Sequence, residues 1–139
     1  MKKLTILKFL VLMLSMVFIL ASCSKEARFE KRIDGTWNIA KLSNQTYEDG
    51  KLTDDYTFND IGTITFEKDG TGEMTVILFG TSTSESFTWT ATSTHISIDG
   101  DPMEIIENKK KTQVWTSDET EVVGGVTTRE VSSITLEKQ

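Results

Sequence analysis

The sequence is poor in three residues that carry much of protein chemistry and covalent structure. Its 139 residues include one cysteine (Cys23), one histidine (His95) and one proline. A single cysteine excludes an intramolecular disulfide, so a hydrophobic core alone must hold the fold. A single histidine excludes a metal site built on paired histidines.

The motifs that mark common enzyme classes are also missing. The sequence has no G-x-S-x-G elbow and no phosphate-binding loop. His95 falls on the polar side of the alternating stretch 94–98, which is typical of a solvated surface histidine. We therefore expect no enzymatic activity, no catalytic residue, no cofactor and no metal. The chain also lacks a basic stripe, which argues against a nucleic-acid partner.

Long apolar runs are confined to the N-terminus. After Met1-Lys2-Lys3, an apolar run of 13 residues extends from Phe9 to Ala21. As a helix rising 1.5 Å per residue it would cover roughly 20 Å, short of the ~30 Å hydrocarbon core of a bilayer. A basic start and a short apolar run predict a secretory signal. A transmembrane helix starting at Leu4 is the alternative.

The end of this run carries a more specific signal. Leu20-Ala21-Ser22-Cys23 resembles the bacterial lipobox at all four positions. The resemblance implies that residues 1–22 are a cleaved lipoprotein signal peptide and that Cys23 is the lipidation site, carrying diacylglyceryl and an amide-linked acyl chain such as palmitate. Two or more chains hold a protein stably at a membrane. Ser24 is not the aspartate of the inner-membrane retention signal of enterobacterial lipoproteins, and Lys25-Glu26 partly resembles the lysine-plus-acid export signal of Bacteroidota surface lipoproteins. This resemblance implies a lipid-anchored envelope protein of the outer membrane and leaves its periplasmic or surface face open.

The chain that would remain is acidic and of single-domain length. Of the 15 lysines and arginines, three precede Cys23, so twelve face 21 acidic residues. Residues 23–33 read as the lipidated cysteine and a charged tether with one helical turn. Residues 34–139 then form one domain.

Period-two alternation of apolar and polar residues dominates this domain. Threonine, valine, isoleucine and aromatic residues are frequent, as in strands. Eight strands are predicted, over residues 36–43, 60–67, 71–79, 85–92, 94–99, 102–107, 112–117 and 127–137. Short links make successive strands antiparallel, and eight strands in an up-and-down meander close into an all-β barrel. An open sheet or a sandwich is the alternative.

The turns predict the register of three hairpins. A three-residue loop at 68–70 pairs Phe66 with Gly72, Ile64 with Met74 and Gly62 with Val76. The turn at 99–102 is expected to pair Ile98 with Met103 and Ile96 with Ile105.

Gly124-Gly125 predicts the turn of the last hairpin. It pairs Trp115 with Ile134 and Gln113 with Leu136. Arg129 falls opposite Thr120, with glutamates at 119 and 121 as expected partners, and the polar stretch 117–121 could bulge.

Two short motifs resemble known families. Gly35-Thr36-Trp37 resembles the G-x-W motif of lipocalins, and residues 66–71 (FEKDGT) resemble the F-x-x-D-G-T hairpin of bacterial lipocalin-like domain lipoproteins of Bacteroidota type. Trp89 and the isoleucines at 96 and 98 fit the same layout. The resemblance covers residues 33–139 and implies a lipocalin-like β-barrel. The later T-D-Y motif and the C-terminal helix of classical lipocalins are missing, so their ligand chemistry does not carry over. The heat-shock-linked META-type domains share the G-T-W start and compete as a fold.

The segment 43–60 is the longest predicted connection. By resemblance to lipocalins it is expected to close over the barrel mouth as a lid, and a mobile loop without a role in binding is the alternative. Its aromatic residues supply the apolar contacts: Tyr47, Tyr56 and Phe58. Its carboxylates do not follow EF-hand spacing, which favours a solvated acidic loop over a calcium site.

The predicted inward face supplies the other ligand-binding candidates, and it either fills a solid core or lines a small cavity. Its members are Trp37, Ile64, Phe66, Met74, Val76, Leu78, Phe87, Trp89, Ile96, Ile98 and Met103. Ligand-binding residues are expected among Trp37, Phe66, Met74, Val76, Phe87 and Trp89.

Two functions remain open at this point. The first is an envelope lipoprotein that binds a small hydrophobic molecule. The second is a non-enzymatic interaction module that presents loops to a protein or glycan partner. In both, the chain meets the membrane through Cys23.

Overall fold

The structure, a computed structural model, describes residues 25–139, which form one helix and nine strands. The predicted signal peptide and Cys23 lie outside the described residues. The strands are β1 (Gly35–Glu48), β2 (Lys51–Asn59), β3 (Gly62–Phe66), β4 (Thr71–Leu78), β5 (Thr81–Ala91), β6 (His95–Ile98), β7 (Asp101–Asn108), β8 (Thr112–Val123) and β9 (Val126–Lys138).

Eight of these strands close an antiparallel barrel, as predicted. Successive strands pair from β3 to β9, and β1 pairs with both β3 and β9, which completes the circuit. Closure leaves no free edge around the helix-proximal end of the barrel. The alternative of an open sheet or a sandwich is therefore excluded.

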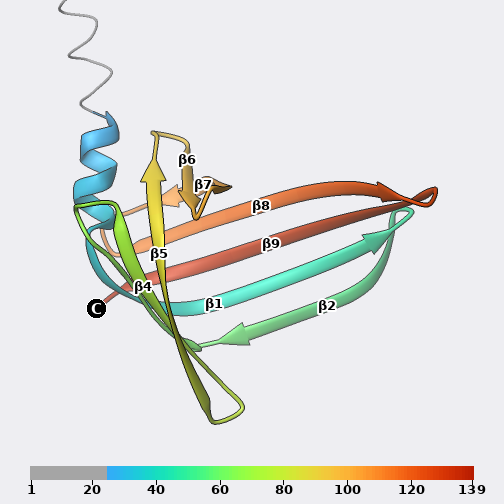
Figure 1. The fold of residues 1–139 in the computed structure, drawn as a ribbon, viewed down its shortest axis with the longest axis horizontal. Helices are drawn as coiled ribbons and strands as arrows, with labels where there is room; N and C mark the ends of the chain where they lie inside the picture. Colours follow the sequence, from blue (N-terminus) through green and yellow to red (C-terminus); the bar gives the residue numbers. More distant parts are fainter. Residues whose placement is uncertain (1–24) are drawn as a thin grey trace, which may run out of the picture.

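The prediction of a lid loop over residues 43–60 is wrong. This segment contains the second half of β1, a tight turn at residues 49–50 and an additional strand, β2. β1 pairs with β3 over residues 35–38 and with β2 over residues 41–48. β2 is exposed at all but one position and the second half of β1 is partly buried, so this stretch lacks the clear apolar-polar alternation of the barrel strands. Together β1, β2, β8 and β9 extend beyond the barrel as one wing, and the β4–β5 hairpin projects separately (Figure 1).

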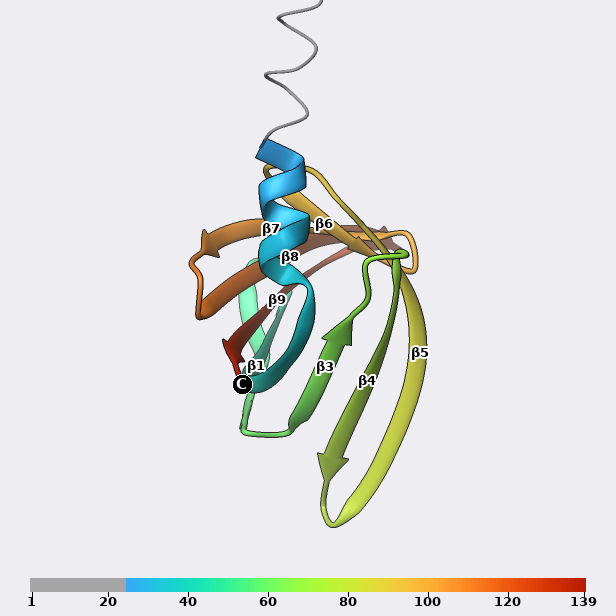
Figure 2. The same cartoon turned by 90° about the vertical axis from the view of Figure 1, so that its left-hand side faces the viewer.

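A helix over residues 25–33 covers one end of the barrel (Figure 2). Phe29 and Ile33 are four positions apart, so they share one helix face, and both are buried. The helix is also bonded to the barrel, since the Trp37 Nε1–H donates to the Ile33 carbonyl at 2.7 Å. The predicted tether with one helical turn is corrected here: from residue 25 the segment belongs to the fold.

The core fills the helix-proximal half of the barrel. Phe66 lies at its centre, with ring centroids 5.4 Å from Phe87, 5.4 Å from Trp89 and 5.7 Å from Trp115. Each pair has a tilted or edge-to-face geometry, which aromatic rings favour. The predicted inward positions are confirmed as buried at Trp37, Ile64, Phe66, Phe87, Trp89 and Ile96.

Two of the three predicted registers are confirmed. Phe66 pairs with Gly72 and Ile64 with Met74, while Trp115 pairs with Ile134. In the third hairpin Ile96 pairs with Met103 and Ile98 with Asp101, two residues away from the expectation. The cause is a tighter turn: residues 99 and 100 alone make it, both with positive φ (50° and 96°), as two-residue hairpin turns require.

The predicted bulge over residues 117–121 is absent, because β8 runs to Val123 in unbroken register with β9. Arg129 does lie opposite Thr120, as expected. Its ion-pair partner is Asp118 rather than a glutamate. The reason is the pleat: residues 119 and 121 point to the other face, while residue 118 shares the face of Thr120.

Candidate ligand-binding pocket at the barrel mouth

The inward face of the barrel changes character along its axis. On β8 the inward positions run from Gln113 and Trp115, which are buried, to Ser117 and Glu119. On β9 they run from Leu136 and Ile134 to Ser132 and Glu130, and the two series pair with one another. The interior is therefore apolar near the helix and polar toward the opposite end, which we call the mouth.

A pocket of about 430 Å³ occupies the mouth. Every barrel strand contributes at least one residue to its lining. Its apolar lining consists of Leu42, Ile64, Met74, Phe87, Ile98, Pro102, Met103 and Ile134. Its polar lining consists of Glu85, Ser86, Asp99, Asp101, Ser117, Glu119, Glu130 and Ser132. The volume falls in the range of small-molecule sites.

All charged side chains that line the pocket are acidic. Five carboxylates line the pocket, and none of the lysines and arginines within residues 25–139 does. One carboxylate is partly engaged: Asp99 Oδ1 accepts the Thr88 backbone N–H at 2.7 Å and the Thr88 hydroxyl at 3.1 Å. The Ser132 side chain is also fixed, because its hydroxyl donates a hydrogen bond to Asn44 Oδ1 at 2.8 Å. The pocket thus combines an apolar floor with an anionic rim.

The predicted inward site residues divide between pocket and core. Met74 and Phe87 line the pocket. Trp37 and Phe66 are fully buried in the core below the pocket and do not line it. Val76 packs partly buried against the core.

Trp89 lies near the helix end of the barrel, where its indole N–H donates hydrogen bonds to the backbone. Its Nε1–H is shared between the carbonyls of Glu67 and Thr71, at 3.1 and 3.0 Å, which fixes the β3–β4 turn. Within the same turn Asp69 Oδ1 accepts the N–H and the hydroxyl of Thr71, and these bonds lower the pKa of Asp69. The D-G-T motif therefore makes a turn and lies at the end of the barrel opposite the pocket.

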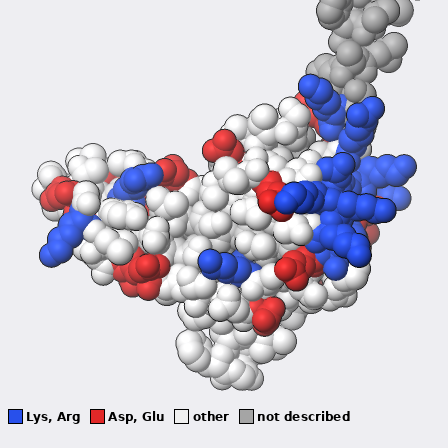
Figure 3. Space-filling view, turned by 180° about the vertical axis from the view of Figure 1, so that it is seen from behind, with Lys and Arg blue, Asp and Glu red and all other residues white. Residues whose placement is uncertain are grey.

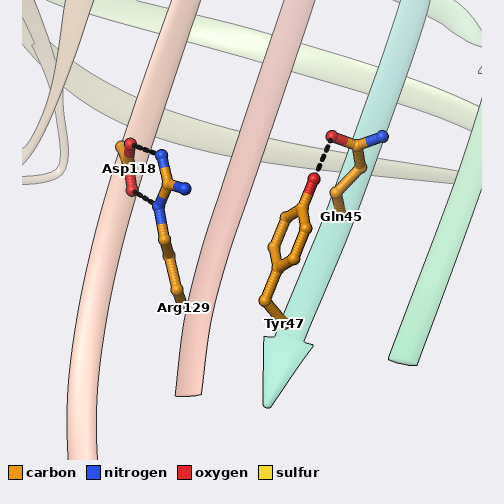
Figure 4. A network of polar contacts seen from close by, with 4 residues as sticks. All are labelled: Gln45, Tyr47, Asp118 and Arg129. Carbon is orange, nitrogen blue, oxygen red and sulfur yellow. Dashed lines mark hydrogen bonds and ion pairs between the residues drawn. The ribbon is translucent and has the colours of Figure 1, made fainter. Parts of the chain in front are cut away.

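Tyr47, a predicted lid residue, lies on the outer face of the wing (Figure 4). Its hydroxyl donates to Gln45 Oε1 at 3.2 Å, and the Arg129 guanidinium lies 5.8 Å from its ring centroid. Arg129 in turn donates two hydrogen bonds to Asp118. Because Tyr47 pairs with Arg129, and Arg129 alternates with the inward Glu130, this cluster faces away from the pocket.

The other two predicted lid residues lie on the pocket side of the wing without lining the pocket. Tyr56 pairs with Asn44, and Phe58 pairs with the pocket residue Leu42. Their rings are 5.5 Å apart, and Phe58 also meets Phe79 of the β4–β5 hairpin at 6.5 Å. Phe79 is otherwise 96% exposed. These aromatics link the two projections beside the mouth.

Several lining residues were missed from the sequence. On β8 and β9 these are Ser117, Glu119, Glu130 and Ser132, and on β1 it is Leu42. The alternation continuing past Trp115 and Ile134 could have found the first four. Leu42 could not be found by alternation, because a bulge between Ile39 and Lys41 shifts the β1 register.

Other candidate chemistry is sparse in the part of the chain that the structure describes. His95 is exposed, with Nδ1 2.9 Å from the Thr94 hydroxyl. No group of three potential ligands among residues 25–139 could hold a metal ion. No helix within that range has the length and apolar character needed to cross a membrane.

Comparison with known proteins finds distant structural similarities only. No protein-family model matches the sequence, and no curated protein is significantly similar to it. Among solved structures, a redesigned β barrel matches with 14% identity and a TM-score of 0.38, over 81% of this chain and 96% of that one. A deswapped triple mutant of bovine odorant binding protein matches with 12% identity and a TM-score of 0.41, over 77% of this chain and 74% of that one.

Proposed function

We propose that this chain is a lipid-anchored envelope protein that binds a small amphiphilic molecule in the pocket at its barrel mouth. The ligand has an apolar body and is neutral or positively charged. The single observation that carries this proposal is the pocket of about 430 Å³ between an apolar floor and a rim of carboxylates. The role is one of binding, without catalysis.

The floor supports an apolar ligand body. It presents isoleucine, methionine and phenylalanine side chains next to the filled core, so a bound hydrocarbon would lose contact with water on several sides. Removal of apolar surface from water stabilises a complex by roughly 25 cal/mol per Å² before the costs of association. A pocket formed by a closed barrel is largely preorganised, which lowers those costs.

The rim supports a ligand head that is not anionic. Fatty-acid carriers need a cation or several donors for the carboxylate, and this lining has neither lysine nor arginine among the described residues. A carboxylate head would instead meet five acidic side chains. Repulsion between like charges at a partly desolvated site costs ~1 kcal/mol or more, whereas an ammonium group would be attracted by the same amount.

The anchoring part of the proposal stands on the sequence. The lipobox-like Leu20-Ala21-Ser22-Cys23 supports processing before Cys23 and lipidation of its thiol. The resemblance of Gly35-Thr36-Trp37 and of the FEKDGT hairpin to lipocalin-like lipoproteins supports the same address. We place the mature chain at the outer membrane.

Three probes with one hydrocarbon chain test the pocket. Dodecylamine, dodecanol and dodecanoate are titrated into the mature chain by isothermal calorimetry. We expect the amine and the alcohol to bind and the acid to bind at least tenfold more weakly, because each tenfold corresponds to about 1.4 kcal/mol. Preferred binding of dodecanoate would contradict the charge argument.

A matched pair of variants places binding in the pocket. Ser117→Trp fills the pocket from β8, while Thr116→Trp adds the same side chain to the outer face of the same strand. The first variant should lose binding and the second should retain it. Equal binding by both variants would show that the probes bind elsewhere.

A second candidate function is an interaction module, and the exposed hairpin tips favour it. Leu52, Val122, Val123 and Val126 are exposed at the end of the wing. Replacement of the three valines by serine should then abolish co-purification of a partner without unfolding the barrel. If the same proteins co-purify with this variant as with the wild type, the wing is not the docking surface.

A further inference from the structure

The positive charge of this acidic protein gathers at one end. Of the twelve lysines and arginines that follow Cys23, nine lie on the helix, on the turns beside it or at the end of β9. They are Lys25, Arg28, Lys31, Arg32, Lys68, Lys109, Lys110, Lys111 and Lys138. Figure 3 shows these side chains massed on the side of the molecule from which the described chain begins.

Six of these cations surround a hollow of about 590 Å³. We call this group the basic collar: Arg28, Lys31, Arg32, Lys110, Lys111 and Lys138. Asp34 is the only acidic residue in the same lining. A second hollow, of about 460 Å³, lies against the same helix, and its charged lining residues are Lys31, Lys68 and one acid, Glu30. The barrel thus presents cations on more than one side of the helix.

Two members of the collar are held by the fold. Arg32 donates to the Asn108 carbonyl at 2.6 Å and to its side-chain oxygen at 3.2 Å, which ties the helix to β7. Lys138 donates to the Asp34 carbonyl and lies 4.5 Å from the Trp37 ring centroid. Burial lowers the pKa of Lys138, and the charge of Asp34 partly offsets that effect.

The other four members are available to a partner. Arg28, Lys31, Lys110 and Lys111 are exposed, and none of them takes part in the three ion pairs found among residues 25–139. Arginine and lysine side chains that form no ion pair raise the local potential and attract anions.

The placement of the collar indicates what kind of anion it meets. The described chain starts at Lys25, on the collar side, two residues after the predicted lipidation site Cys23. A lipid on Cys23 would therefore bring this end of the barrel to the membrane surface. Lysine and arginine residues next to a membrane anchor bind anionic headgroups, and a single acyl signal plus a basic patch makes a stable anchor.

We propose that the basic collar docks on the anionic phospholipid headgroups of a membrane, with the helix end toward the bilayer and the pocket mouth away from it. The anionic rim of the pocket then lies at the end farthest from the membrane charge. This proposal rests on the proposed anchor for its choice of membrane. The docking itself requires no lipid on Cys23, so the two can fail separately.

Vesicle flotation tests the docking without the lipid anchor. Residues 25–139 contain the helix and the whole closed barrel, so the chain from Ser24 on is used. It should bind vesicles of phosphatidylglycerol and phosphatidylethanolamine, fail to bind pure phosphatidylcholine vesicles, and be released by 0.5 M salt. An oligonucleotide of matched charge serves as the competing polyanion. Binding to it as tight as to the vesicles would overturn the proposal.

Two double variants with equal net charge give the decisive comparison. Lys110→Gln/Lys111→Gln removes two collar cations, and Lys41→Gln/Lys51→Gln removes two exposed cations from β1 and β2. The collar variant should bind the anionic vesicles at least tenfold more weakly, and the control should bind like the wild type. If both variants lost vesicle binding equally, net charge alone would explain binding, and the proposed role of the basic collar would be wrong.

Orientation is measured on the full lipidated protein, whether or not the shortened chain folds. A fluorophore is placed on Ser93→Cys, in the turn at the helix end, or on Ser82→Cys, at the β4–β5 hairpin. After reconstitution in the anionic vesicles, headgroup-labelled quencher lipids should quench the first fluorophore several-fold more than the second. Equal quenching, or stronger quenching at position 82, would contradict the orientation.

Discussion

At the residue scale, two buried tryptophans differ in one hydrogen bond. Trp37 and Trp115 are both 0% exposed, but only the Trp37 indole N–H has a partner, the Ile33 carbonyl. Phenylalanine in place of either residue removes the same volume. Trp37→Phe also leaves a buried carbonyl without its donor, so it should be the more destabilising by about 1–3 kcal/mol.

Urea unfolding followed by circular dichroism measures this difference directly. The two variants serve as controls for one another, because the change in size is shared. A larger loss of unfolding free energy in Trp115→Phe would mean that the Trp37 bond does not help to fix the helix on the barrel.

Position 72 has no room for a side chain larger than that of glycine. A Cβ atom at this position would overlap the Phe87 ring and the Thr65 carbonyl oxygen. Gly72→Ala should therefore destabilise the barrel by roughly 1–3 kcal/mol, as overpacking does. Alanine at Gly100 is a useful contrast, because there the cost is backbone strain in an open turn with nothing within contact distance. A fully stable Gly72→Ala barrel by thermal unfolding would contradict this packing.

Asp118 and Arg129 form an ion pair on the outer face of the wing. The hydrogen bonds from Arg129, more than its charge, hold the pKa of Asp118 below its ordinary value. Arg129→Gln should return that pKa upward, measured by carboxyl carbon NMR between pH 2 and 6. The pair stabilises the fold above the ordinary aspartate pKa, and its contribution is lost as the pH falls. An unchanged titration in Arg129→Gln would show that the pair does not form in solution.

At the scale of elements, the N-terminal helix closes the barrel end. Phe29 is 2% exposed and packs in the core with Ile33. Phe29→Ala should cost about 3–5 kcal/mol, because it leaves a large cavity at the end of the core. Glu30→Ala, on the exposed side of the same helix, is the control and should change the unfolding free energy little. If both variants unfold at the same urea concentration as the wild type, the helix does not contribute to the fold.

The eight barrel strands could be predicted because their sequences alternate and their turns are short. The residue spacing around Gly70 and Gly124-Gly125 also determined two registers, since a slip of one residue would mix the faces. The register after Asp99-Gly100 was not determined in this way. A slip of two residues keeps the same faces, so only the positive φ of both turn residues distinguishes the choices.

The elements that could not be predicted lack a clear pattern of apolar residues in the sequence. β2 is exposed at all but one position and the second half of β1 is partly buried at almost every position, so neither shows the alternation of a strand with one buried face. The helix at residues 25–33 has only two buried side chains, which a charged sequence of nine residues conceals. Both were set by tertiary pairing rather than by local preference.

At the scale of the whole molecule, the barrel has two chemically different ends. The helix end carries nine cations and a filled aromatic core, while the mouth carries the pocket and its carboxylates. Alternation predicted Met74 and Phe87 among the inward positions, and both line the pocket. Continued alternation could have added Glu119 and Glu130, but it could not show that these two carboxylates meet Glu85, Asp99 and Asp101 around one pocket, because that requires the barrel to close.

The measurement that tests the binding role most directly is native mass spectrometry of the protein purified gently from its own host. We predict a stoichiometric adduct of one small, neutral or cationic amphiphile per chain, absent from the Ser117→Trp variant and present in Thr116→Trp. A bare protein mass for the wild type, or an adduct retained by Ser117→Trp, would contradict a ligand in the mouth pocket.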